Sequence, residues 1–150
     1  MNSSNLIQQV KDLIPKSLDD IVRKNRHLLQ LEYANSEDVL KLTKRIQTTS
    51  FKGSLVDAFL YKRIIKISEV EPVCAVGYLI TDLGKIAFHT SQVVGLDDEQ
   101  KIILTNSGSH YKIESLSDTQ NTDSTLLMHI CHVAHRDGWG NHFGIPEIYY

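Results

Sequence analysis

Residues 73–116 constrain the fold most strongly, because they form a series of short apolar runs separated by turn residues. The first run, residues 73–81, has the length of a strand and is followed by a turn at residues 82–84. Three further runs follow between polar or glycine-containing loops, at residues 85–94, 101–105 and 110–116. This spacing is typical of an antiparallel meander. A sheet with one apolar face needs a covering layer, so we expect helices to pack against it.

The alternation within residues 85–94 also predicts which side chains share a face of that strand. Phe88, Thr90 and Val94 are expected on one face, whereas His89 and Val93 point to the other. His89 is therefore predicted to lie on the face opposite Phe88.

Residues 1–67 are predicted to be helical. Apolar residues recur at helical spacing before Pro15, after Ser17 and after Asn35, and serine and asparagine are residues that cap helices. These three segments are expected to be helices over about residues 6–14, 17–29 and 36–46. Residues 55–67 keep the same spacing but end in an alternating stretch, so we expect a helix with a strand-like end.

A further helix and an aromatic tail are predicted in residues 123–150. Asp123 or Ser124 caps a helix over about residues 125–135, and Gly138 ends it. Four of the chain's eleven aromatic residues lie in the last twelve positions. Because each aromatic side chain buries a large area, we expect this tail to dock, either on its own core or on a second copy of the chain.

These patterns together predict a single α+β domain over residues 1–150. It comprises N-terminal helices in residues 1–67, a β meander in residues 73–116, and a C-terminal helix with a docked tail in residues 123–150. The expected sheet is four-stranded and antiparallel, with a small barrel-like sheet as the variant. A chain of 150 residues is long enough to bury one core.

Composition excludes several classes of protein. The chain is 41% hydrophobic with a net charge of −2, as in ordinary globular proteins. No apolar run approaches the ~18 residues of a membrane helix, and the N-terminus lacks the apolar core of a signal peptide, so we expect a cytoplasmic protein with no membrane partner. The excess of basic residues in the first half is too small to predict nucleic-acid binding. The two cysteines are expected to be buried thiols.

A cluster of histidines suggests a site near the C-terminus. His129, His132, His135 and His142 fall within fourteen residues. On a helix, His129 and His135 would lie on the order of 10 Å apart, too far to share one zinc ion. Two neighbouring histidines could share an ion if a third ligand folded back. Because no known ligand motif is present, we predict neither a metal nor another cofactor, and the weak candidate ligands are His129, His132 and His142.

A groove between the sheet and the C-terminal helix would gather the remaining candidate residues. The candidate catalytic residues are His89, His135 and Asp137. The candidate ligand-binding residues are His110, Lys112, His132, Arg136 and Trp139. Imidazole, guanidinium and aromatic groups of this kind can bind a phosphate or carboxylate, or transfer a proton.

Three functions are compatible with these residues. We expect a non-catalytic binding module for a small anionic ligand or a protein partner, acting as a homo-oligomer, because no nucleophile motif or cofactor loop is recognisable. The first alternative is a histidine-based or metal-assisted hydrolase of phosphate esters. The second is a structural or regulatory adaptor that binds proteins through the helical face of Lys41, Lys44 and Arg45.

Overall fold

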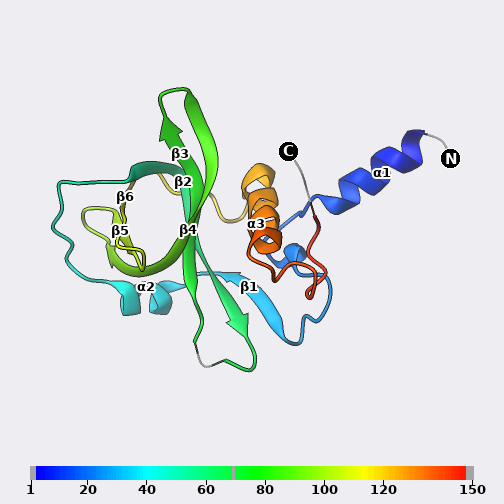
Figure 1. The fold of residues 1–150 in the computed structure, drawn as a ribbon, viewed down its shortest axis with the longest axis horizontal. Coiled ribbons are helices and arrows are strands. Elements are labelled where there is room, and N and C mark those ends of the chain that lie inside the picture. Colours follow the sequence, from blue (N-terminus) through cyan, green and yellow to red (C-terminus); the bar gives the residue numbers. More distant parts are fainter. Residues whose placement is uncertain (1–2, 69, 148–150) are drawn as a thin grey trace.

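A six-stranded sheet with flanking helices forms the fold in the computed structural model, which describes residues 3–68 and 70–147 (Figure 1). The helices are α1 (Ser3–Leu13), the 3-10 turn η1 (Asp19–Ile21), α2 (Ser36–Leu42) and α3 (Ser124–Arg136). The strands are β1 (Leu29–Tyr33), β2 (Gly53–Ile65), β3 (Val73–Thr81), β4 (Gly84–Asp97), β5 (Ile102–Thr105) and β6 (His110–Ile113). The predicted α+β class is confirmed.

Strands β2 to β6 close into a barrel. Each pairs antiparallel with the next, and β6 then pairs in parallel with the start of β2, with Gly53 opposite Tyr111. The sixth strand, β1, adds antiparallel to the other end of β2. The barrel-like variant is therefore confirmed, whereas a four-stranded, purely antiparallel sheet was wrong. Strand closure satisfies backbone groups that an open sheet would leave unpaired.

The prediction of a helix over residues 55–67 was wrong, because these residues belong to β2. A bulge between Val56 and Phe59, with Asp57 at a φ of 52°, shifts the alternation by one residue. Both faces of the strand are also covered: Leu55 packs inside the barrel, while Phe59 packs in a second core outside it. A shifted, two-sided apolar pattern mimics helical spacing.

The predicted second helix, residues 17–29, was also wrong. It is reduced to η1, and Leu29 already begins β1. The third predicted helix is confirmed but shorter, and it starts at a capping box in which the side chain of Asn35 accepts from the backbone N–H of Asp38. Pairing of β1 with β2 buries Leu29 and Leu31 in the core, and this tertiary gain overrides the local helical pattern.

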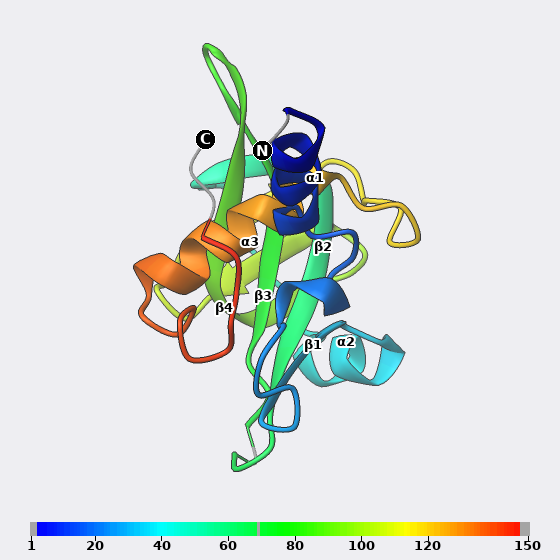
Figure 2. The same cartoon turned by 90° about the vertical axis from the view of Figure 1, so that its right-hand side faces the viewer.

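Helix α3 covers the outer face of β3 and β4 and forms a second core there, as Figure 2 shows. Gly138 follows the helix with a φ of 91°, as its predicted role at the helix end requires. The described part of the tail turns back onto the same chain, where the carbonyl oxygen of Phe143 accepts from the N–H groups of Arg23 and Lys24. Residues 145–147 of the tail are not in a strand, and residues 148–150 lie outside the described residues.

The helix α1 projects away from the rest of the fold (Figure 1). Its residues Ile7, Val10 and Leu13 are exposed. No helix within the described ranges combines the length and the apolar character needed to cross a membrane.

Candidate functional site

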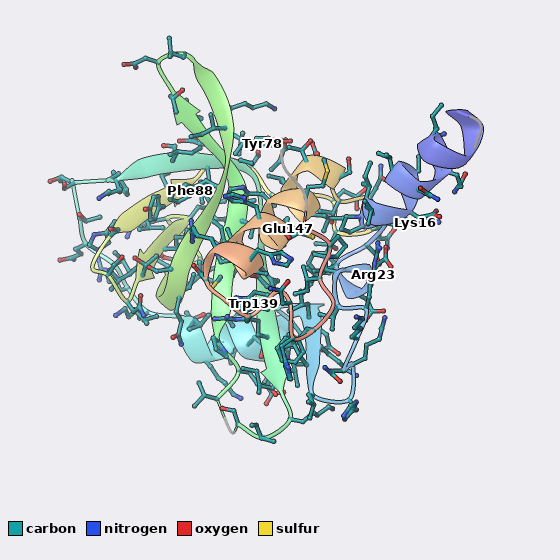
Figure 3. The ribbon with its side chains drawn as sticks, turned by 45° about the vertical axis from the view of Figure 1, so that its right-hand side comes forward. Lys16, Arg23, Tyr78, Phe88, Trp139 and Glu147 are labelled. Carbon is teal, nitrogen blue, oxygen red and sulfur yellow. The ribbon has the colours of Figure 1, made fainter. Side chains whose placement is uncertain are left out.

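A pocket of about 200 Å³ lies between the outer face of the barrel and the C-terminal end of α3. We call it the Arg63 pocket. Strands β2, β3 and β4 supply one wall, and α3 with the loop that follows it supplies the other. Its lining residues are Tyr61, Arg63, Cys74, His89, Thr90, Ser91, Gln92, Val133, Arg136, Asp137 and Trp139. Figure 3 shows Trp139 beyond the C-terminal end of α3.

A bulge in β4 shapes the sheet wall of this pocket. His89 pairs with Val76, but Gln92 pairs with Cys74, so β4 contains one extra residue there. At the bulge, the backbone N–H of Ala75 donates to the side-chain oxygen of Thr90 at 3.0 Å. Beyond the bulge the alternation reverses. The prediction that Val94 shares a face with Phe88, and Val93 with His89, was therefore wrong: Val93 packs in the same core as Phe88, and Val94 is exposed.

The imidazole of His89 is fixed at both nitrogens. Its Nε2 lies 2.6 Å from the hydroxyl group of Tyr61, and its Nδ1 lies 2.7 Å from the carbonyl oxygen of Thr90. Burial lowers the pKa of His89 to about 4 and raises the pKa of Tyr61. Both side chains are therefore neutral near pH 7. Burial also raises the pKa of the neighbouring Cys74 thiol, which keeps this sulfur protonated and poorly nucleophilic.

Arg63 is the charged group of this wall. Its guanidinium carbon lies 5.3 Å from the centre of the Trp139 ring, a cation–π contact. Its Nε is buried and has no hydrogen-bond acceptor among the residues that the structure describes, and the same holds for Nε1 of Trp139. No carboxylate of the described chain forms an ion pair with Arg63. The pocket thus contains two buried donors without acceptors, and one of them belongs to a cation.

The opposite wall carries an ion pair. Nε of Arg136 donates to Oδ1 of Asp137 at 3.1 Å, and both side chains are exposed. Asp137 is also the C-terminal cap of α3, where the helix carries a partial negative charge. The charged lining is therefore two guanidinium groups and one carboxylate, which suits an anion better than a metal cation.

His135, a predicted catalytic residue, lies outside the lining of the Arg63 pocket. Its Nε2 lies 2.8 Å from the carbonyl oxygen of Ile145, and its ring packs against Gly140. His135 therefore fixes the start of the tail.

The other C-terminal histidines do not assemble into a metal site. His129 and His132 stack at 5.9 Å between ring centres, and burial lowers the pKa of His129 to about 4. His142 packs against Phe143 instead. Within residues 3–68 and 70–147, no three His, Cys, Asp or Glu side chains lie close enough to hold a metal ion.

His110 and Lys112, predicted ligand-binding residues, lie on β6. This strand is on the side of the barrel away from α3 (Figure 1). Of the predicted site residues, the structure brings together His89, Arg136, Asp137 and Trp139. It leaves His110, Lys112, His132 and His135 outside that lining.

Sequence reasoning missed Arg63 and Tyr61, because residues 55–67 were predicted to be a helix. A strand pattern would have placed both on one face, two residues apart.

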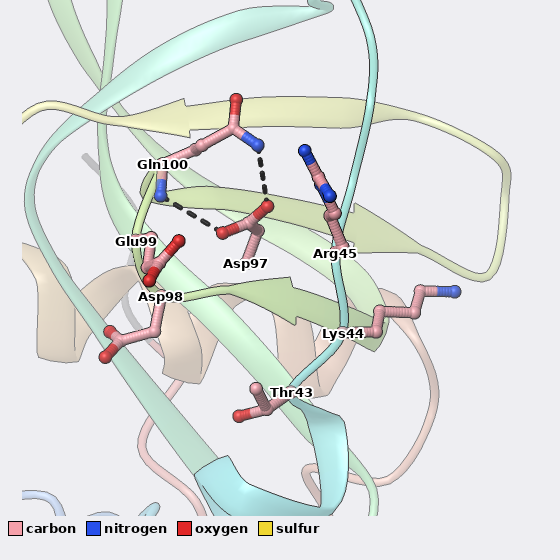
Figure 4. Close-up of a pocket in the computed structure, with 7 residues that line it drawn as sticks. All are labelled: Thr43, Lys44, Arg45, Asp97, Asp98, Glu99 and Gln100. Carbon is pink, nitrogen blue, oxygen red and sulfur yellow. Dashed lines mark hydrogen bonds between the residues drawn. The ribbon is translucent and has the colours of Figure 1, made fainter.

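A second, more open hollow is built around Asp97, which is buried (Figure 4). Its carboxylate accepts from the backbone N–H groups of Ile46 and Gln100 and from the side-chain amide of Gln100, at 3.0, 3.1 and 2.8 Å. The two backbone hydrogen bonds hold the pKa of Asp97 below its ordinary value. These hydrogen bonds join the segment after α2 to the β4–β5 turn. Because the carboxylate of Asp97 already accepts them, it has little capacity left for a ligand.

No family model matches this sequence, and comparisons with curated proteins and with solved structures give no match either.

Proposed function

We propose that this chain is a non-catalytic binding module that holds a small anionic ligand in the Arg63 pocket. One observation carries the proposal: the guanidinium group of Arg63 lines a pocket, and its buried Nε has no acceptor among the described residues. A buried donor without an acceptor costs about 1–3 kcal/mol, and more when the donor is charged. An anion in the pocket would remove this cost and neutralise the charge.

The remaining lining supports the same function. Arg136 adds a second cation at the rim, while Ser91 and Gln92 add polar groups from the strand. The volume of about 200 Å³ is smaller than the roughly 300–1,000 Å³ of pockets for drug-sized ligands. The ligand would therefore be small.

The hydrolase alternative has weaker support from this geometry. A general base needs a free nitrogen near the proton that it removes. Both nitrogens of His89 lie within hydrogen-bond distance of Tyr61 and Thr90, and the hydroxyl group of Thr90 donates to the carbonyl oxygen of Ser91. A nucleophile and a free base therefore do not meet in the described pocket.

The second part of the proposal is that the chain associates with a second copy of itself or with a protein partner. The supporting observation is α1, whose exposed Ile7, Val10 and Leu13 form an apolar stripe on a helix of 11 residues. Isolated helices of this length are marginal in water, so a covering surface would stabilise α1. Sedimentation velocity tests self-association. A monomer at every concentration, unchanged by Val10→Asp, would count against the homo-oligomer.

The anion proposal can be tested by fluorescence, because Trp139 is the only tryptophan of the chain. We expect a saturable change in its emission on titration with phosphate, sulfate, acetate or cyclohexanecarboxylate at constant ionic strength. Arg63→Gln should weaken the binding of any anion that gives this change by about tenfold or more. Arg26→Gln is the matched control, since Arg26 pairs with Asp19 on an exposed surface. If no anion of the panel gives a saturable change, the proposed function is wrong.

A further inference from the structure

The balance of charge in the Arg63 pocket limits the charge of its ligand. Arg63 has no carboxylate partner within the described chain, but Arg136 is already paired with Asp137 at 3.1 Å. The carboxyl end of α3 also adds partial negative charge beside Asp137. The pocket therefore offers about one uncompensated positive charge, which matches a monoanion better than a dianion.

The backbone around the pocket differs from that of a phosphate site. Phosphate groups are commonly held at the N-terminus of a helix, where free N–H groups point at the anion. In this pocket the helix ends, and the N–H groups that follow it are used within the chain: those of Asp137, Gly138 and Trp139 donate to carbonyl oxygens of α3. Phosphate would meet the wrong end of a helix dipole.

Two buried donors of the pocket residues lack acceptors in the described chain, and a carboxylate has two oxygens that accept. Nε of Arg63 and Nε1 of Trp139 both lack an acceptor in the part of the chain described, and their side chains are in cation–π contact at 5.3 Å. A planar guanidinium binds a planar carboxylate through two parallel hydrogen bonds, and an indole N–H can add one more. A carboxylate entering the pocket would meet both side chains.

The rest of the lining mixes polar and apolar groups, since Ser91 and Gln92 are polar. Val133 and the ring of Trp139 are apolar, and the Cys74 thiol is protonated. The hydroxyl group of Tyr61 is already used by His89. A volume of about 200 Å³ has room for a body of about one ring.

We infer that the ligand of the Arg63 pocket is a small monocarboxylic acid, bound through its carboxylate to Arg63 and Trp139. The inference rests on the proposed function, because it names the class of anion that the same pocket would hold. It distinguishes that ligand from inorganic phosphate and from neutral compounds of the same shape.

Three probes test this inference on the unmodified protein: cyclohexanecarboxylate, its neutral amide cyclohexanecarboxamide, and inorganic phosphate. Binding is followed by Trp139 fluorescence and by calorimetry at pH 7.5 and fixed ionic strength. We expect the carboxylate to bind about tenfold or more tightly than either of the other two probes. The comparison needs no variant, so it does not depend on the folding of a mutant.

Two substitutions locate the carboxylate. Arg63→Lys keeps the charge but loses the paired geometry, so it should weaken carboxylate binding about tenfold, whereas Arg26→Lys should leave it unchanged. Trp139→Phe, followed by calorimetry, should also weaken binding by removing the indole N–H. Backbone NMR spectra check that each variant is folded.

The outcomes separate the inference from the proposed function. Phosphate binding as tightly as the carboxylate, or more tightly, overturns the monocarboxylate inference and leaves an anion-binding module. Equal binding of the amide and the carboxylate overturns the inference, because the charge then contributes nothing. Binding by neither anion overturns the inference, and it overturns the proposed function as well if sulfate and acetate also fail to bind.

Discussion

The hydroxyl group of Tyr61 and Nε2 of His89 lie 2.6 Å apart beneath α3. The other ring nitrogen of His89 faces the carbonyl oxygen of Thr90, which can only accept a hydrogen bond. The proton of the neutral imidazole is therefore on Nδ1, and Tyr61 donates to Nε2. This arrangement couples β2 to β4 at the floor of the Arg63 pocket, and it holds only while His89 is neutral.

The first prediction concerns pH. Burial lowers the pKa values of His89 and His129 to about 4, whereas an unfolded histidine has a pKa near 6.5. Between these values the unfolded chain binds more protons, so the free energy of unfolding should rise with pH from about 4 to 6.5 and level off above. The slope of the free energy of unfolding against pH should correspond to about one proton per histidine, and urea denaturation at a series of pH values measures it.

His89→Gln should remove the contribution of His89 to the pH dependence of the free energy of unfolding. His27→Gln is the matched control, because His27 is exposed. An equal slope in His89→Gln and in the unmodified protein would contradict the assignment to His89.

The second prediction concerns the ion pair between Lys62 and Asp38, at 3.0 Å, where Lys62 is buried. Burial opposes the ionisation of Asp38, but the N–H of Asn35 and the ammonium group of Lys62 hold the pKa of Asp38 below its ordinary value. Asp38→Asn should lower the free energy of unfolding by about 3 kcal/mol, because it leaves a buried cation with one weaker partner, Glu71, at 3.5 Å.

Glu37→Gln is the matched control, since Glu37 forms an exposed pair with Lys41 at 3.9 Å. It should change the free energy of unfolding by less than about 1 kcal/mol. Equal effects of the two substitutions in urea denaturation would show that burial of the Lys62 pair has no energetic consequence.

The third prediction concerns the docking of the tail. Ile145 is 4% exposed and packs in the core beneath α3. Ile145→Ala should lower the free energy of unfolding by about 2–5 kcal/mol through lost burial and a cavity. Ile67→Ala, at a site 90% exposed, should change it by no more than about 0.5 kcal/mol. Thermal unfolding of both variants checks the difference, and similar melting temperatures would argue against a docked tail.

The fourth prediction concerns Gly140. A Cβ added there would lie 2.7 Å from Nδ1 of His135, whose other nitrogen contacts the carbonyl oxygen of Ile145. Gly140→Ala should therefore lower the free energy of unfolding by about 1–3 kcal/mol. In a His135→Ala background the clash is absent, so the same change should have a smaller effect. Additive effects in this double-mutant cycle would refute the contact.

Part of the candidate site could be predicted from sequence. His89 was placed on the strand face opposite Phe88, and Arg136, Asp137 and Trp139 at the end of the C-terminal helix, and the structure brings His89 together with these three. The alternation of a strand and the period of a helix fix the direction of each side chain locally. His132 and His135, which were expected in the same groove, lie outside it, because His132 stacks on His129 and His135 contacts the carbonyl oxygen of Ile145.

Local pattern by itself determined the strands of the meander, the caps at Asn35 and Asp123, and the glycine that ends α3. Those features depend on neighbours a few residues away. Tertiary structure alone decided that residues 53–65 form a strand, that β6 closes the barrel on β2, and that Arg63 meets Trp139. Each of these depends on contacts between residues far apart in the chain, and the free energy gained by burying both faces of β2 outweighs a helical spacing that its sequence also carries.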